Sequence, residues 1–178
     1  MDLVQAIDLI YLFRIQGEEG NAWKVAFQTD GTQDETRNYE TTPTKDGAKK
    51  TAGDYEGSHS LTSLLAKGDE DIRKINNLVR KDNPEKLEVW EIDRSDIGES
   101  ENIPGDYSTD VVTSFSKSAG ADGNVEVSIE TEVEGTIISG DVTVTPELLA
   151  ILQKISEEQA FVQPIAEVDN GDGGGVEG

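Results

Sequence analysis

The sequence predicts a mainly β protein of the α+β class, in which two helices accompany the strands. Residues 125–134 alternate strictly between apolar and polar side chains, as a half-buried strand does. Residues 7–15 are apolar on both faces, which is typical of a strand that is central in a sheet or covered by a neighbour. Residues 72–79 instead repeat apolar side chains at helical spacing. The 178 residues favour a single domain.

The first strand is predicted over residues 7–15, IDLIYLFRI, and the second over residues 23–29, WKVAFQT. Between them, residues 17–21 have the sequence GEEGN, which is typical of a turn, so the two strands are expected to pair as a hairpin. The side chains of the second strand that are expected to face the core are Trp23, Val25 and Phe27.

Residues 30–55 are rich in Thr, Asp, Lys and Gly and nearly lack aliphatic side chains, so a long mobile loop is predicted there. Four of the fifteen basic residues of the chain lie in this segment: Arg37, Lys45, Lys49 and Lys50, with Asp46 beside Lys45. One interpretation is a solvated loop. The other is an arm whose cations meet an acidic surface on another copy of the chain.

A strand is predicted over residues 56–67 and a helix over about 69–82. Asp69 is expected to cap this helix, and Asn83-Pro84 is expected to stop it. Further strands are predicted over residues 87–93 and 107–117, with an acidic loop over 96–105 between them and a turn over 118–123.

The strand that follows carries carboxylates on one face and no cation. Its acidic side chains are Glu126, Glu130, Glu132 and Glu134. Like charges at this spacing repel one another, so the face is either a solvated outer surface or a surface that must not bind an anion. Beyond Glu134 the apolar positions change parity, and a bend or bulge near Gly135 or Gly140 is predicted to join two strands at the centre of the sheet.

The end of the chain is predicted to hold a second helix over about 146–159, with Thr145 as its cap and Pro146 in its first turn. Residues 167–178, EVDNGDGGGVEG, have the composition of a flexible tail.

Composition excludes several functions. The net charge of −22 argues against binding nucleic acid through a basic patch and against binding an anionic membrane. The chain has no cysteine for a disulfide or thiolate metal site, no apolar run long enough to span a membrane, and no basic segment of the kind that begins a signal peptide. We therefore expect assembly in the cytoplasm.

No catalytic, cofactor or metal site is expected. His59 is the one histidine, and nothing near it resembles a nucleophile elbow. The Asp-Gly pairs of the chain do not continue into the spaced acidic ligands of a calcium loop, so they are interpreted as turns. Paired carboxylates are plentiful, but nothing marks any two of them as a glycosidase pair.

The order of the elements resembles the major tail tube proteins of long-tailed, non-contractile phages, of the lactococcal type. The resemblance covers residues 7–159. The segments that carry it are residues 10–14 (IYLFR), 24–29 (KVAFQT), 44–47 (TKDG), 63–69 (SLLAKGD), 87–93 (LEVWEID) and 124–128 (NVEVS).

The resemblance implies a two-sheet β-sandwich or barrel-like tube fold with a flanking helix, forming one tail-tube domain over residues 1–166 that precedes the tail over 167–178. It also implies a structural virion protein of the tail, whose hexameric rings stack into a tube. The implied partners are other copies of the chain, the tape-measure protein, the tail terminator and distal tail proteins, and DNA in transit, with no membrane and no cofactor.

Two hypotheses about surfaces follow. The acidic strand with Glu130 and Glu132 lines the lumen, where it would keep DNA from adhering, and the loop with Lys45 and Lys49 joins stacked rings. The alternative class is a stand-alone acidic β-sandwich binding module, such as an adhesin or carbohydrate binder. That class would need exposed aromatic side chains, and the candidates, Trp23 and Trp90, lie in strand patterns that indicate burial.

Overall fold

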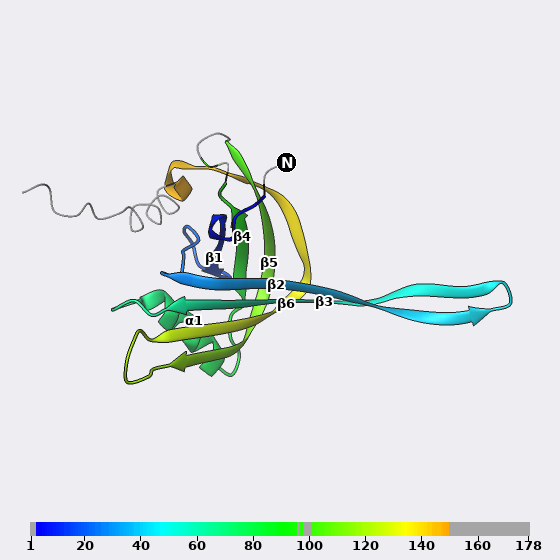
Figure 1. The fold of residues 1–178 in the computed structure, drawn as a ribbon, viewed down its shortest axis with the longest axis horizontal. Coiled ribbons are helices and arrows are strands. Elements are labelled where there is room, and N and C mark those ends of the chain that lie inside the picture. The colour runs from blue at the N-terminus through cyan, green and yellow to red at the C-terminus, as the bar shows by residue number, and fades with distance from the viewer. Residues whose placement is uncertain (1–2, 96, 98–100, 150–178) are drawn as a thin grey trace, which may run out of the picture.

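The computed structural model describes residues 3–95, 97 and 101–149 (Figure 1). Their elements are η1 (Ala6–Asp8), β1 (Leu9–Ile15), β2 (Gln28–Thr44), β3 (Gly47–Leu64), α1 (Glu70–Arg80), β4 (Leu87–Asp93), β5 (Asn102–Ser118) and β6 (Glu126–Thr143). The six strands form one antiparallel sheet in the order β1-β4-β5-β6-β3-β2. The mainly β prediction is therefore confirmed.

The sheet curls until its two edge strands, β1 and β2, approach each other, so the fold is the barrel-like form of the prediction rather than two separate sheets. β5 and β6 are long strands of 17 and 18 residues that pair along nearly their whole length. Two register shifts in their ladder, at Tyr107/Thr109 and Val112/Ser114, allow the pair to bend. One continuous pair of strands thus spans both halves of the curled sheet (Figure 1).

β1 is covered on both faces, as its sequence predicts. Tyr11, Phe13 and Ile15 belong to the main core cluster, which α1 completes through Ile72, Ile75 and Leu78. Ile10 and Leu12 belong to a second cluster on the other face, together with Ile92 and Ile103. β1 is an edge strand, so the two apolar faces reflect coverage by neighbours and not a central position.

The predicted hairpin of residues 7–15 with 23–29 is wrong. β1 instead pairs with β4 along its full length, from Leu9↔Asp93 to Ile15↔Leu87. The second segment keeps only one bridge, between Phe13 and Trp23. A local turn signal favoured the nearby partner, but the apolar strand that buries β1 lies much later in the chain.

The predicted inward position of Phe27 is also wrong, although Val25 is fully buried. Phe27 has a φ of 52°, a left-handed conformation that bulky side chains rarely adopt, and its side chain is 51% exposed. The chain turns at this residue before β2 begins, so the alternation of the sequence does not continue through it.

The predicted mobile loop over residues 30–55 is wrong as well, because these residues form most of β2 and β3. The two strands pair from Gln28↔Ser63 to Thr44↔Gly47, and a tight turn at Lys45 and Asp46 joins them. Gly47 has a φ of 127°, which suits glycine alone. The segment lacks aliphatic side chains because most of it is exposed, while its threonines suit an extended strand.

The predicted break in the acidic strand is a bulge at Gly135, which has a φ of 86°. On β6 the pairing passes from Glu134 to Ile138 while β5 passes only from Thr109 to Tyr107. The two extra residues leave the parity of β6 unchanged, so Val142 projects to the same side as Glu134 and packs with its partner Ile103 in the second cluster, on the other face of the sheet from Val127 and Ile129. β6 nevertheless remains one strand in place of the two that the sequence suggested.

The first predicted helix is confirmed. Asp69 Oδ1 accepts hydrogen bonds from the N–H groups of Asp71 and Ile72 at 3.0 and 3.1 Å, and Arg80 lies in the last turn. A second helix begins at residues 146–149, where Thr145 caps the Leu148 N–H. The rest of the helix predicted over 146–159, the centre of the loop predicted over 96–105 and the tail predicted over 167–178 lie outside the described residues.

Candidate assembly surfaces

The acidic strand exposes one face, as its alternation predicted. Glu126, Glu130 and Glu132 are exposed on β6, whereas Val127 and Ile129 between them are 0% and 1% exposed. Glu134, the fourth predicted residue, is also exposed but forms an ion pair with Lys86. Among the ion pairs of the described residues, none involves the other three glutamates of the set.

The same face continues across the neighbouring strands, because residues paired in an antiparallel ladder project to the same side. On β3, Ser58 pairs with Glu132 and Ser60 with Glu130. On β5, Ser114 pairs with Glu130. On β2, the corresponding residues are Asp30, Thr32 and Asp34. We call this surface of β2, β3, β5 and β6 the acidic face; the positions named here carry hydroxyl or carboxyl groups and no cation.

The long β2–β3 hairpin projects far beyond the sheet (Figure 1). β3 pairs with β6 only from Ser58 to Leu64, so residues 35–57 pair with one another alone, and we call them the arm. Residues 47–57 of β3 would reach about 35 Å past the sheet at about 3.3 Å per residue.

The structure brings the predicted stacking residues together on the arm. Lys45 and Asp46 form its turn, and Lys49 and Lys50 follow on β3 opposite Thr42 and Thr41. Arg37 lies closer to the sheet, where its guanidinium stands 5.7 Å from the centre of the Tyr55 ring and donates to the Gly53 carbonyl oxygen. All five predicted residues are exposed.

His59 does not lie at an accessible catalytic site. Its side chain is 6% exposed inside the barrel, and its Nδ1 lies 2.7 Å from Oδ2 of the fully buried Asp110. Asp110 also accepts hydrogen bonds from the hydroxyl groups of Ser108, at 2.5 Å, and Thr131. These partners satisfy a carboxylate that would otherwise be costly to bury. The network therefore has a structural role beneath the acidic face.

Sequence reasoning missed Asp110. The available signal was that Ser108, Asp110 and Val112 share one side of the strand predicted over residues 107–117. That side proved to be the buried one, with Asp110 at 0% exposure.

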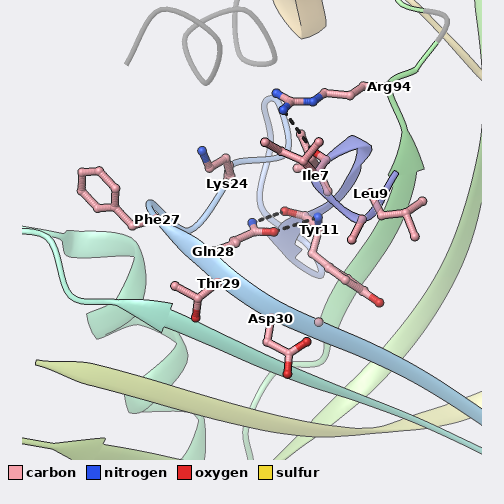
Figure 2. Close-up of a pocket in the computed structure, with 12 residues that line it drawn as sticks. Ile7, Leu9, Tyr11, Lys24, Phe27, Gln28, Thr29, Asp30 and Arg94 are labelled. Carbon is pink, nitrogen blue, oxygen red and sulfur yellow. Dashed lines mark hydrogen bonds between the residues drawn. The ribbon is translucent and has the colours of Figure 1, made fainter. Parts of the chain in front are cut away.

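A second missed feature is a pocket of about 420 Å3 at the seam where β1 and β2 approach each other (Figure 2). Figure 2 shows Phe27 on one side, Ile7 and Leu9 on the other, and Gln28 between them. The Gln28 amide binds the N–H and carbonyl groups of Tyr11, at 3.0 and 2.7 Å. The pocket also has Lys24, Asp30 and Arg94 in its walls.

Two groups near the seam have shifted pKa values. Burial raises the pKa of the Tyr11 hydroxyl above its ordinary value, and the hydrogen bond to Glu91 raises it further. The hydrogen bonds from Arg14 hold the pKa of Glu88 below its ordinary value, at Nε–Oε2 and Nη2–Oε1 distances of 2.6 and 3.1 Å. Both pairs join β1 to β4 and stabilise the edge of the sheet.

The candidate aromatic residues of a binding module are packed. Trp23 lies against the main core cluster and Trp90 against the second cluster. Trp90 also contacts Tyr107 and stacks under the Arg14 guanidinium, 5.2 Å from its ring centre. Neither ring is presented as a free platform for a sugar.

Within the described ranges, no group of three or more His, Asp or Glu side chains is arranged to hold a metal ion. No helix in the part of the chain that the structure describes is long and apolar enough to cross a membrane.

A curled sheet with an open edge strand, a projecting arm and a one-signed face defines a structural subunit that joins other copies of itself. The chain belongs to the phage tail tube protein family, because the family model of that description matches residues 4–139. Members of this class are structural components of phage tails.

The tail tube protein gp17.1* of Bacillus phage SPP1 is 27% identical to the chain over 149 residues, which is 83% of the chain and 55% of that protein. The chain thus spans about half the length of this relative. A hybrid NMR and electron-microscopy structure of the SPP1 tail tube matches with a TM-score of 0.70 and 21% identity, covering 83% of this chain and 86% of the other. These likenesses confirm the tail-tube fold.

Two further solved structures share the fold. The tail of an empty gene transfer agent particle, refined with C6 symmetry, has a TM-score of 0.54 and 13% identity, with 79% of this chain and 98% of the other covered. An extracellular contractile injection system in its sheath–tube complex has a TM-score of 0.57 and 15% identity, with 75% and 89% covered. The matched structures named here come from tails, tubes or sheath–tube complexes of those proteins.

Proposed function

We propose that the chain assembles into stacked hexameric rings that form the tail tube of a long-tailed, non-contractile phage. The tube encloses the tape-measure protein and later conducts DNA during ejection. Its ends bind the tail terminator and the distal tail proteins, and assembly takes place in the host cytoplasm. Family membership and the C6 symmetry of a similar tail support this proposal.

The acidic face is the observation that carries the proposal. Duplex DNA has one negative charge per roughly 1.7 Å of its axis, and carboxylates repel it. Glu130 and Glu132 stand in rows of serine, threonine and aspartate without a lysine or arginine at the named positions. Repeated around a ring, this face would give a lumen to which DNA does not adhere.

The edge of β2 supports closure of the ring. β2 is the last strand of the sheet and pairs on one side only, with β3. An open edge is a surface to which a strand of another copy can add. A ring needs such a contact between two different surfaces, because each copy must bind one neighbour on either side.

The arm supports stacking of the rings. It extends beyond the sheet of its own subunit, and its turn carries Lys45, Lys49 and Lys50 in a chain whose net charge is −22. The tip of the arm, residues 45–50, has three lysines and one aspartate and is therefore attracted to the acidic surface of another copy. The arm is long enough to leave its own ring.

Negative-stain electron microscopy of the purified protein across a concentration series, with light scattering on the same samples, tests the proposal. We expect rings or tubes with an open channel. A strict monomer at every concentration would contradict self-assembly of the chain alone.

A variant without the arm separates stacking from ring formation. Replacing residues 37–55 by Asn-Gly would close the hairpin next to the Thr36–Glu56 pair. We expect monomers or single rings and no tubes. Tubes of normal length from this variant would show that the arm does not join the rings.

A further inference from the structure

Large exposed apolar side chains form a group near the start of β2, and one more lies farther along this strand. Ile7, Leu9 and Phe27, at 59%, 39% and 51% exposure, surround the seam pocket at the beginning of the strand. Tyr39, at 60%, lies on the arm. The arm has no other large exposed apolar side chain among the described residues.

We propose that the Tyr39 side chain of one copy docks in the seam pocket of the next copy along the tube. The inference rests on the proposed stacking of rings by the arm and adds the site that receives the arm. Phe27 directly precedes β2, and the turn at Lys45 follows the other end of that strand, so the start of β2 and the tip of the arm lie at opposite ends of the subunit (Figure 1). Phe27 and Gln28 line the pocket. In a stack of copies with one orientation, an arm leaving one copy meets the pocket end of the next.

The geometry of Phe27 favours a contact surface. A bulky residue with a φ of 52° carries backbone strain, and burying its ring in the core would offset that cost. The ring is instead half-exposed at the rim of the pocket (Figure 2). The strain holds an apolar side chain outside the core, where a second copy can cover it.

The charges around the two surfaces are complementary. Lys24 and Asp30 lie in the walls of the pocket, and Arg37 and Glu40 flank Tyr39 on the arm. Because Arg94 also lines the pocket, the pocket side has two cations and one anion around an apolar centre, and the arm side has one of each. Such a rim fixes the orientation of a contact more than it adds affinity.

The contact is heterologous, because it joins two different surfaces of the chain. It does not close into a ring, so it can repeat from copy to copy along the tube axis. It also limits the spacing of the rings. Tyr39 follows Phe27 by twelve positions, and a strand rises by about 3.3 Å per residue, so the rise between successive rings is at most about 40 Å.

Crosslinking through introduced cysteines tests the proposal, since the natural chain has none. The test variant combines Tyr39→Cys with Ile7→Cys. The control combines Tyr39→Cys with Val79→Cys, because Val79 is an exposed apolar residue on α1 away from the pocket. Both are assembled and treated with a short bismaleimide crosslinker, and the products are separated on a denaturing gel.

We expect the test variant to give a ladder of covalent products longer than six chains, and the control to give at least tenfold less. A ladder that stops at the number of chains in one ring would assign the contact to neighbours within a ring and overturn the proposal. Intact tubes without crosslinking above the control would overturn it as well, while leaving the proposed function standing.

The rise of the wild-type tube supplies a second measurement that needs no variant. A rise at or below about 40 Å is expected from the strand geometry, and a clearly larger rise would place Tyr39 out of reach of the pocket. If the wild-type chain forms no tubes, the proposed function fails first and this inference fails with it.

Discussion

Gln28 and Tyr11 exchange two hydrogen bonds across the seam of the barrel. Gln28 Nε2 donates to the Tyr11 carbonyl oxygen at 2.7 Å, and the Tyr11 N–H donates to Gln28 Oε1 at 3.0 Å. A neighbouring strand would make the same pair of bonds with an edge residue. The Gln28 side chain thus satisfies the backbone N–H and carbonyl groups of Tyr11 on β1. At the other end of the strand order, β2 remains an open edge of the sheet.

Replacing Gln28 by leucine removes both bonds and leaves the Tyr11 peptide groups unpaired. We expect the free energy of unfolding to fall by about 1–3 kcal/mol, measured by urea denaturation. Gln5→Leu is the control, because the Gln5 amide makes only an exposed bond to the Leu3 carbonyl oxygen. Equal losses for the two variants would show that the seam does not depend on Gln28.

Gly31 allows the ring of Tyr11 to lie against β2. A Cβ atom at Gly31 would stand 2.3 Å from Tyr11 Cε2, so the ring would have to move. We expect Gly31→Ala to cost about 1–3 kcal/mol in unfolding free energy, as overpacking does. Gly140→Ala, which meets nothing within 4 Å, should change stability by at most about 0.5 kcal/mol. A stable Gly31→Ala variant would contradict the close approach of β1 and β2.

The Arg14–Glu88 pair predicts part of the acid sensitivity of the fold. Because the pKa of Glu88 is lowered in the folded state, its contribution to stability is present above its ordinary pKa of 4.5 and is lost as pH falls through the lower, folded value. In Glu88→Gln, unfolding free energy should therefore fall less between pH 7 and acid pH than in the natural protein.

Glu85→Gln is the control for this measurement. The pKa of Glu85 is also lowered, by the hydrogen bond from Lys81, but both side chains of that pair are about half exposed and solvent screens them. Its pH dependence should stay close to that of the natural protein. A Glu88→Gln variant with an unchanged pH profile would show that the Arg14 pair does not favour the folded state.

Reversing charge on the acidic face tests its assignment to the lumen. Phage particles whose tails carry Glu130→Lys and Glu132→Lys should have intact tails but slow or blocked DNA ejection, because cations in the channel bind phosphate. Glu18→Lys with Glu19→Lys makes the same change in charge at an exposed turn. DNA release from triggered particles compares the two. Normal release with the first pair would place the acidic face outside the channel.

Local patterns predicted the strands and the helix that contact the core. Alternation identified the buried side of β6, and apolar spacing with the Asp69 cap identified α1. They failed for the arm, because strands that make no core contact carry no apolar alternation. Local patterns predicted the strand β1 but gave it the wrong partner. Its partner, β4, lies more than seventy residues later in the sequence, at a distance that no local pattern reveals.

Of the candidate surfaces, one part could be predicted from a local pattern and the rest depends on contacts between distant strands. Four glutamates of one strand were visible in the sequence, but the rows of Ser58, Ser60 and Ser114 beside them depend on the register of neighbouring strands. The seam pocket depends on the approach of β1 and β2, the two ends of the sheet order. Such features appear only once the chain is folded.

The order β1-β4-β5-β6-β3-β2 also bears on how the chain folds during synthesis. β6 is the last of the six described strands to be made, yet it lies between β5 and β3 and is the link between the two halves of the sheet. Until residues 126–132 have left the ribosome, β3 lacks its partner on this side, and the β2–β3 hairpin is not joined to the rest of the sheet. Subunits therefore acquire their complete assembly surfaces late, which protects nascent chains from polymerising before they are released.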